Sequence, residues 1–286
     1  MEPDLRLVPI KSIDLQEELD RTRLGALVTA FKQSGILKDP PIVAKGLGGK
    51  LTQLDGTTRI SALKELGASH VVVQVVDYSD VSQVDIKSWV HVSRVKKGGF
   101  AGKIKALEGA RTEEFKVGLG TTLIDHPSVV AAIIFRDGRG LNVYNRAKQG
   151  LLGRRRRPSG EGDLFERVAL LRRVVRLYEE SITRDEQETI DSMEELEDFF
   201  ARHKDKNVAL FFPSFSTQEI GTLLKKGVTL PAGITRHVIN GRVLRINYPL
   251  EMLSLEKPDE DKLRYFDDFI KNVGLRFYEE PTFIAD

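Results

Sequence analysis

The sequence LTQLDGTTRISALKELG at residues 51–67 predicts a strand, a tight turn and a helix in immediate succession. Residues 51–54 are a short apolar strand, and Asp55-Gly56 is the turn that ends it. Apolar residues then recur at helical spacing until a glycine stops the helix: Ile60, Leu63, Leu66 and Gly67. A strand that leads directly into a helix is typical of α/β (α+β) folds, which we expect for this chain.

The first turn of this predicted helix has the residue types of an anion site. Gly56 lets the backbone approach a ligand, and the free N–H groups of a helix N-terminus favour negative charge. Thr57 and Thr58 add hydroxyl donors, and the Arg59 guanidinium can bind phosphate through two N–H groups. Asp55, at the carboxyl end of the strand, is placed to meet a metal ion or a substrate hydroxyl. The same residues also fit a plain Asp-Gly turn followed by threonine helix caps.

The residues around this motif predict an N-terminal domain over residues 1–95. The expected elements are an edge strand at 5–13, a helix from Asp20 to Gly35, a strand at 42–44, a glycine turn at 46–49, a buried strand at 71–76, and a helix that includes Ile86, Trp89 and Val90. Strands and helices alternate along this region, as they do in α/β domains.

Residues 96–286 predict a second, mixed α/β domain. Its expected elements are strands at 129–135 and 208–212, helices at 164–180 and 192–203, a short helix opened by a Ser216–Glu219 capping box, a hairpin about Asn240-Gly241, and a last helix at 258–274. A polar loop at 150–162 carries four consecutive arginines, Arg154 to Arg157. This cluster fits a solvated loop or a contact with a polyanion.

Composition excludes several classes of protein. The chain has 286 residues, no cysteine and a formal net charge of +2. Without cysteine, disulfides, thiolate metal sites, cysteine nucleophiles and sulfiredoxin-type chemistry are excluded. A net charge this small does not indicate that the protein as a whole binds nucleic acid. The chain has no long apolar run and an acidic start without a signal peptide, so we expect a cytoplasmic protein with no membrane span.

Other candidate residues each have a structural alternative. Glu17 and its neighbour Glu18 fit a pair that complements the dipole of the following helix. Trp89, the only tryptophan, fits a core position or a ligand platform, and His91 is uninformative by itself. The group Thr235-Arg236-His237 is a compact set of anion donors or a structural loop. The histidines lack the spacing of a zinc site, and no Walker, kinase, hydrolase or Rossmann motif is present.

Residues 5–92 resemble the ParB/sulfiredoxin-like domain, in which an Asp-Gly-x-x-Arg turn receives nucleotide phosphates. Within that superfamily the chain is most similar to the free L-serine kinases, which include an archaeal ADP-dependent enzyme and one encoded with staphyloferrin B biosynthesis. Four blocks carry the resemblance: LVPIKSIDLQE (7–17), LDGTTRISALKELG (54–67), SWVH (88–91) and PAGITRHVINGR (231–242). The last block lies outside a ParB domain and therefore separates the kinase branch from the DNA-partition branch.

The resemblance implies a role for each matching residue. Glu17 takes the place of the catalytic glutamate, and Asp55 that of the aspartate needed for phosphoryl transfer, where it would hold Mg²⁺ or the substrate hydroxyl. The nucleotide phosphates would be held by Gly56, Thr57, Thr58 and Arg59. The serine zwitterion would be bound by Trp89, His91, Thr235, Arg236 and His237. The chain departs from the family at Gln16, which replaces a histidine, and at Thr57-Thr58, which replaces a His-His or Val-His pair.

The function implied by the resemblance is a Mg²⁺-dependent kinase that converts L-serine to O-phospho-L-serine, with ATP or ADP as donor and Glu17 as general base. The second domain would then fold back over the first to complete a cleft. The family suggests cysteine synthesis or siderophores containing 2,3-diaminopropionate as the routes that use the product. The alternative is a ParB-like, nucleotide-responsive, DNA-binding transcriptional regulator, which the ParB-like domain and the four arginines favour.

Overall fold

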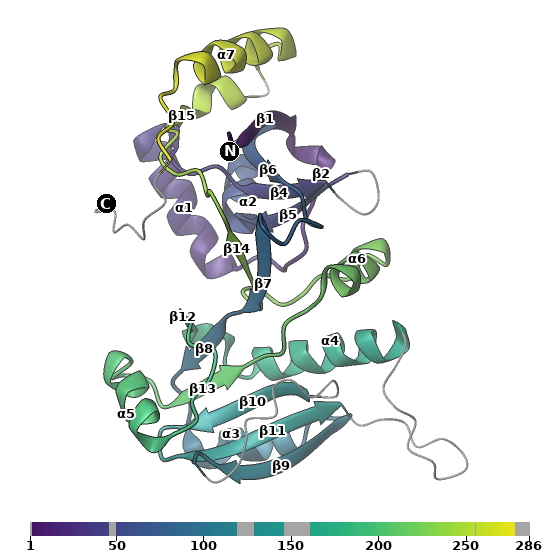
Figure 1. Ribbon diagram of the computed structural model, residues 1–286, viewed down its shortest axis with the longest axis vertical. Helices are drawn as coiled ribbons and strands as arrows, with labels where there is room; N and C mark the ends of the chain where they lie inside the picture. Colours follow the sequence, from purple (N-terminus) through teal and green to yellow (C-terminus); the bar gives the residue numbers. More distant parts are fainter. Residues whose placement is uncertain (1, 46–49, 119–128, 146–160, 255, 278–286) are drawn as a thin grey trace. The chain divides into compact units, whose positions relative to one another are not determined.

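The computed structural model describes residues 2–45, 50–118, 129–145, 161–254 and 256–277 (Figure 1). The chain divides into a first unit of Met1–Asp85 with His237–Asp286 and a second unit of Ile86–Arg236. This division differs from the predicted one at residue 95, because the C-terminal segment belongs to the first unit. The glycine turn at 46–49 and the four arginines at 154–157 lie outside the described residues. Within the described ranges no helix is long and apolar enough to cross a membrane.

The C-terminal segment joins the first unit through its apolar side chains. Tyr248 and Leu253 are completely buried in a core that also contains four valines of the strand at residues 70–76. Phe266, on the last helix, is buried in the same core. Burial of such side chains is the main force that stabilises a domain, so this segment folds with the N-terminal residues.

The first unit is built on a five-stranded mixed sheet in the order β1-β6-β4-β5-β2. Its strands are β1 (Asp4–Pro9), β2 (Ile13–Asp14), β4 (Ile42–Lys45), β5 (Leu51–Asp55) and β6 (His70–Val76). The β6 strand is buried along its whole length, as its run of β-branched residues predicts. Two helices, α1 (Arg21–Ser34) and α2 (Thr57–Glu65), pack against each other, and Asp20 caps α1 as predicted. Further elements of this unit are β3 (Ile36–Leu37), β15 (Tyr248–Pro249), which pairs with β3, the helix α7 (Asp259–Asn272) and two 3-10 helices, η1 (Ile10–Ser12) and η3 (Leu250–Leu253).

The second unit is built on a six-stranded antiparallel sheet in the order β12-β8-β13-β10-β11-β9. Its strands are β8 (Val90–Ser93), β9 (Ala110–Lys116), β10 (Val129–Phe135), β11 (Arg139–Asn145), β12 (Thr183–Asp185) and β13 (Val208–Phe211). Its helices are α3 (Lys97–Lys105), α4 (Glu161–Arg176), α5 (Met193–Arg202) and α6 (Thr217–Lys225). In Figure 1, α4 runs along the sheet, where it packs on β10 and β11. The Ser216–Glu219 capping box is present, and the mixed α/β class is confirmed.

Two predictions about local structure are wrong. Ile86, Trp89 and Val90 do not form a helix, since β7 (Val84–Ser88) and β8 occupy this stretch. The spacing of three apolar residues fits a helix, but the alternating pattern around them, with valine at every second position of β8, favours strands. The hairpin about Asn240-Gly241 also fails to form. The β14 strand (Thr235–Ile239) pairs with β7 instead, and the chain after Gly241 continues without a return strand.

Candidate active site

The predicted strand–turn–helix motif is present at the end of β5. Asp55 is the last residue of this strand, and α2 begins at Thr57. Between them Gly56 has φ +96°, in the left-handed region, and no side chain caps the helix. A Cβ atom on Gly56 would lie 2.9 Å from the Cβ of Pro41 and 3.1 Å from the Arg59 guanidinium. The backbone conformation and the close approach therefore both require glycine, and the uncapped N–H groups of α2 are left to bind an anion.

Replacing Gly56 by Ala is expected to lower the free energy of unfolding by about 1–3 kcal/mol, because alanine is strained at this φ and its methyl group collides with Pro41. Urea unfolding followed by circular dichroism measures the change. Gly25→Ala is the matched control. Gly25 lies inside α1 with open space around it, and alanine there is expected to stabilise the protein by about 0.5–1 kcal/mol. Equal effects of the two substitutions would contradict the role given to Gly56.

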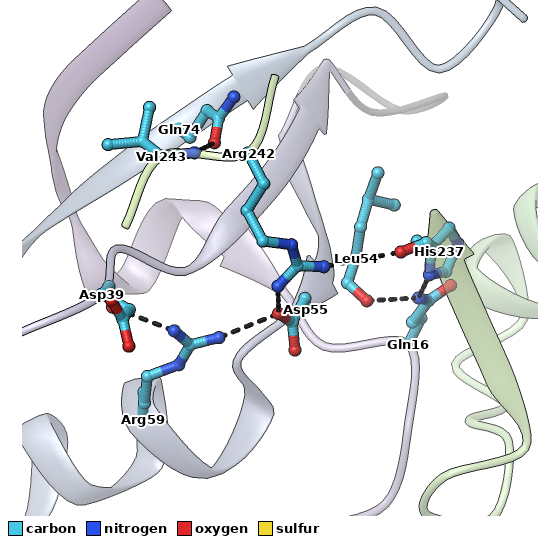
Figure 2. Close-up of polar contacts among 9 residues, drawn as sticks. All are labelled: Gln16, Asp39, Leu54, Asp55, Arg59, Gln74, His237, Arg242 and Val243. Carbon is cyan, nitrogen blue, oxygen red and sulfur yellow. Dashed lines mark hydrogen bonds and ion pairs between the residues drawn. The ribbon is translucent and has the colours of Figure 1, made fainter. Parts of the chain in front are cut away.

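Asp55 forms ion pairs with two arginines (Figure 2). Its Oδ2 atom lies 3.0 Å from Nη2 of Arg59, one helical turn ahead, and also contacts Nη1 of Arg242. Burial would raise the pKa of Asp55, but the two guanidinium groups outweigh it and hold the pKa below its ordinary value. The carboxylate is therefore ionised at neutral pH, and the two cations leave one positive charge in excess beside the α2 N-terminus.

Arg59 is fixed at both ends of its guanidinium. Its Nη2 atom binds Asp55, and its Nη1 atom donates a hydrogen bond of 3.0 Å to the carbonyl oxygen of Asp39. Thr57 and Thr58 are partly exposed on the first turn of α2. The residues predicted to hold phosphate groups thus lie together at one helix terminus. Their hydrogen-bond donors are already in place, so binding an anion would need little rearrangement of these side chains.

His237 connects this cluster to the N-terminal block of the sequence. Its Nε2 atom lies 2.8 Å from the Tyr78 hydroxyl, and its Nδ1 atom lies 3.5 Å from Nε2 of Gln16. Gln16 is 1% exposed and also donates to the carbonyl oxygen of Leu54, at 3.4 Å. Burial lowers the pKa of His237 to about 4, so the ring is neutral at pH 7 and offers one donor and one acceptor.

Glu17 stands beside the same cluster. Its side chain is partly exposed, and its charge adds to the effect of burial in raising the pKa of Tyr78. The first unit therefore brings both predicted catalytic carboxylates to one network, with Tyr78 and His237 between them. Sequence reasoning missed Tyr78 and Arg242. Arg242 is the last residue of the fourth block, and its position there was the available signal.

Trp89 and Arg236 contact each other in the second unit. The Arg236 guanidinium lies 5.2 Å from the centre of the Trp89 ring and forms an ion pair with Glu186. A cation over an aromatic face is held by the ring quadrupole, so this contact fixes the direction of the guanidinium. Thr235, the preceding residue, is buried. Contacts within the second unit thus hold the Thr235-Arg236 pair in place, and its use as a set of anion donors stays a prediction.

His91 has a position in the core of the second unit. It is completely buried, with Nε2 2.7 Å from the Gly233 carbonyl oxygen and Nδ1 2.9 Å from the Tyr178 hydroxyl. Burial lowers its pKa to about 3, so the ring is neutral. Nε2 therefore carries the proton and donates to Gly233, two residues before Thr235. This geometry gives His91 a supporting role for the Gly233 loop, where the resemblance implied contact with serine.

The described residues contain no group of three or more carboxylate or histidine side chains that could hold a metal ion. Mg²⁺ does not require such a group, because it commonly binds one or two carboxylates, several waters and the phosphates of its substrate. The Asp55 carboxylate is ionised, as that mode of binding requires, and its Oδ2 atom already contacts Arg59 and Arg242.

Comparison with solved structures identifies the class of fold. The chain is similar to a free serine kinase in complex with AMP, with a TM-score of 0.62 and 18% identity over 88% of this chain and 95% of that one. It is also similar to a conserved hypothetical protein from Pyrococcus furiosus, with a TM-score of 0.62 and 18% identity over 87% of this chain and 97% of that one. No protein-family model matches the chain. The fold is therefore that of a free serine kinase.

A particular relative matches this chain from end to end. The ATP-dependent L-serine kinase SbnI of Staphylococcus aureus is 25% identical over 288 residues, which cover 99% of this chain and 97% of SbnI. The structure of a C-terminally truncated SbnI has a TM-score of 0.67 and 23% identity over 94% of this chain and 96% of that one. The resemblance to free L-serine kinases is thereby confirmed, and nothing in these comparisons supports the DNA-binding alternative.

Proposed function

We propose that this protein is a kinase that phosphorylates free L-serine to O-phospho-L-serine, with ATP as the donor. The observation that carries the proposal is the network joining Glu17, His237 and Asp55 in a chain that matches an ATP-dependent L-serine kinase over its full length. Phosphoryl transfer needs positioning and charge neutralisation more than covalent work by the protein, and the residues of this network provide both.

Glu17 is the general base in this proposal. The serine hydroxyl oxygen forms a bond to the terminal phosphorus of ATP, the bond from that phosphorus to the bridging oxygen breaks, and ADP leaves. The hydroxyl proton passes to the Glu17 carboxylate, which must be ionised to accept it. The Tyr78 and His237 side chains are both neutral at pH 7, so neither ring adds a positive charge near this proton acceptor.

The α2 N-terminus and Arg59 bind the phosphates of the nucleotide. The backbone N–H groups after Gly56, the hydroxyls of Thr57 and Thr58, and the remaining N–H donors of Arg59 all suit phosphate oxygens. Mg²⁺ would be held by Asp55 together with phosphate oxygens, and would supply neutralisation of the charge on the transferred group. These contacts strengthen as charge shifts onto the leaving oxygen.

Arg236 and Thr235 bind the serine carboxylate in this proposal. Stacking of Arg236 on Trp89 orients its guanidinium for a bidentate contact, and Thr235 adds a hydroxyl donor. His91 acts as a positioning residue through the Gly233 carbonyl, while neutral His237 offers a hydrogen bond to the zwitterion.

The proposed function is tested by ³¹P NMR of the protein with Mg²⁺ and L-serine, run in parallel with ATP and with ADP. We expect a phosphomonoester resonance that matches O-phosphoserine in the ATP sample. Parallel samples with threonine and homoserine measure acceptor selectivity, which one methyl or methylene group changes by about 1–3 kcal/mol. Absence of product from serine with both donors would refute the kinase. Product with ADP alone would refute the choice of donor.

A further inference from the structure

The segment at residues 241–245, which we call the strap, is held to the first unit by a buried glutamine. Gln74, on β6, is 3% exposed, and its side chain binds the strap twice; Figure 2 shows the contact with Val243. Its Nε2 atom donates to the Gly241 carbonyl oxygen, and its Oε1 atom accepts from the Val243 N–H, each at 2.9 Å. Gln74 thus satisfies the backbone on both sides of Arg242, the residue between these two contacts.

The far end of the strap is held by Asp39. The Arg245 N–H donates to Oδ1 of Asp39 at 2.8 Å, while Arg245 itself has φ +56°, a conformation unfavourable for a side chain of this kind. The carbonyl oxygen of the same Asp39 accepts the hydrogen bond from Arg59. One residue therefore contacts both the strap and the second arginine that binds Asp55.

These contacts have one shared result, which is the placement of Arg242 on Asp55. Its side chain is 34% exposed, and an arginine with three or more rotatable bonds loses much conformational freedom when it is held in one place. Because the strap is fixed at two points, part of this conformational freedom is already lost before any ligand binds. The guanidinium still has N–H donors beyond the one on Asp55, so it can contact an anion while paired.

We propose that Gln74 is a positioning residue that sets Arg242 beside Asp55, and that Arg242 and Arg59 together bind the phosphate groups of the nucleotide. The inference rests on the proposed kinase function for its substrate. It adds to that function a residue from the C-terminal segment and a buried side chain outside the four blocks that resemble the kinase family. Gln74 itself touches neither Asp55 nor, in this proposal, the nucleotide.

A double-mutant cycle tests whether Gln74 acts through Arg242. Gln74→Met removes both hydrogen bonds with little change in volume and is expected to lower kcat about 10-fold, and Arg242→Gln about 100-fold, the range seen when one fixed electrostatic contact is lost. If the two residues act as a unit, the kcat of the double variant is no lower than the kcat of Arg242→Gln alone. Effects that multiply, or unchanged kcat in Gln74→Met, would overturn the proposal.

Lys262→Met is the matched control for stability. Lys262 is 1% exposed and anchors another part of the C-terminal segment, where its Nζ atom donates to Ser69 Oγ at 2.6 Å and to Asp259. We expect a lower Tm with kcat close to that of the wild type. If Gln74→Met does not fold, Asp39→Ala loosens the strap from its other end and leaves the backbone carbonyl that binds Arg59. The same coupling with Arg242→Gln is then expected, and its absence would count against the proposal.

A second measurement does not depend on the kinase reaction. The order parameter of the Arg242 Nε–H group, measured by ¹⁵N NMR relaxation, is expected to fall in Gln74→Met, because the strap no longer holds the guanidinium beside Asp55. It is expected to stay unchanged in Lys262→Met. If the wild type fails to phosphorylate serine, the proposed function fails, while this measurement still decides whether Gln74 places Arg242. An unchanged order parameter in Gln74→Met would overturn the positioning role.

Discussion

Glu17→Gln is expected to lower kcat for serine phosphorylation by about 10²–10⁴-fold, the usual range for loss of a positioned general base. The amide has nearly the shape of the carboxylate but cannot take the hydroxyl proton. Because Glu17 lies beside Tyr78 and makes no part of the α2 N-terminus, the nucleotide is expected to bind with the Kd of the wild type. Initial rates in a coupled assay give kcat, and isothermal titration calorimetry gives Kd.

Glu18→Gln is the matched control, since it removes the same charge from the neighbouring residue. We expect kcat and Kd close to the wild-type values. A split in which Glu17→Gln loses turnover and keeps Kd identifies a group that acts in the transition state. Near-normal turnover in Glu17→Gln, or an equal loss in Glu18→Gln, would show that the base lies elsewhere.

The strand–turn–helix motif could be predicted from the sequence because its determinants are local. The apolar strand, the positive φ that Gly56 must adopt and the helical spacing of the next residues all lie within residues 51–67. Arg59 is also predictable in this sense, since it lies on the first turn of α2, four residues after Asp55. Glu17 and the distant block that contains His237 were identified as candidate site residues through the resemblance to a kinase family.

The contacts that assemble the site could not be predicted in the same way. His237 meets Gln16 across 221 positions of sequence, Tyr78 across 159, and Arg242 meets Asp55 across 187. No periodicity links such residues, and a single side chain carries no sign of its burial. His91 illustrates this, because only the fold reveals that its ring is enclosed and hydrogen-bonded to Gly233 and Tyr178.

The division into compact units differs from the predicted domain boundary for a related reason. The sequence after residue 95 loses its clear pattern, which suggested a break there, but compact units are defined by contacts and not by continuity of the chain. The C-terminal segment carries Tyr248, Leu253 and Phe266, whose side chains are buried in the core of the first unit. Their apolar pattern predicts a helix or a strand but does not say which core it covers.

Asp55→Asn is expected to lower kcat by about 10²-fold or more, because the asparagine can neither hold Mg²⁺ with a full charge nor neutralise Arg59 and Arg242. Because the two guanidinium groups depress the pKa of Asp55, the carboxylate stays ionised as pH falls to the ordinary range of aspartate, near 4. The acid limb of kcat/KM that Asp55 controls therefore lies below that range in the wild type. It is expected to move to higher pH in Arg242→Gln and to be absent from the residual activity of Asp55→Asn.

Asp14→Asn is the control for this change, because Asp14 is an exposed aspartate of the first unit that pairs with Lys50 at 3.3 Å. A surface pair of this kind contributes only about 0–1 kcal/mol, so its loss is expected to leave both kcat and the pH profile unchanged. The profile also tests whether the reaction needs the ionised form of Asp55. If it does not, Arg242→Gln would lower kcat without moving the acid limb. Movement of the limb to higher pH shows that activity depends on the Asp55 carboxylate in its ionised form, in contact with Arg59 beside the α2 N-terminus.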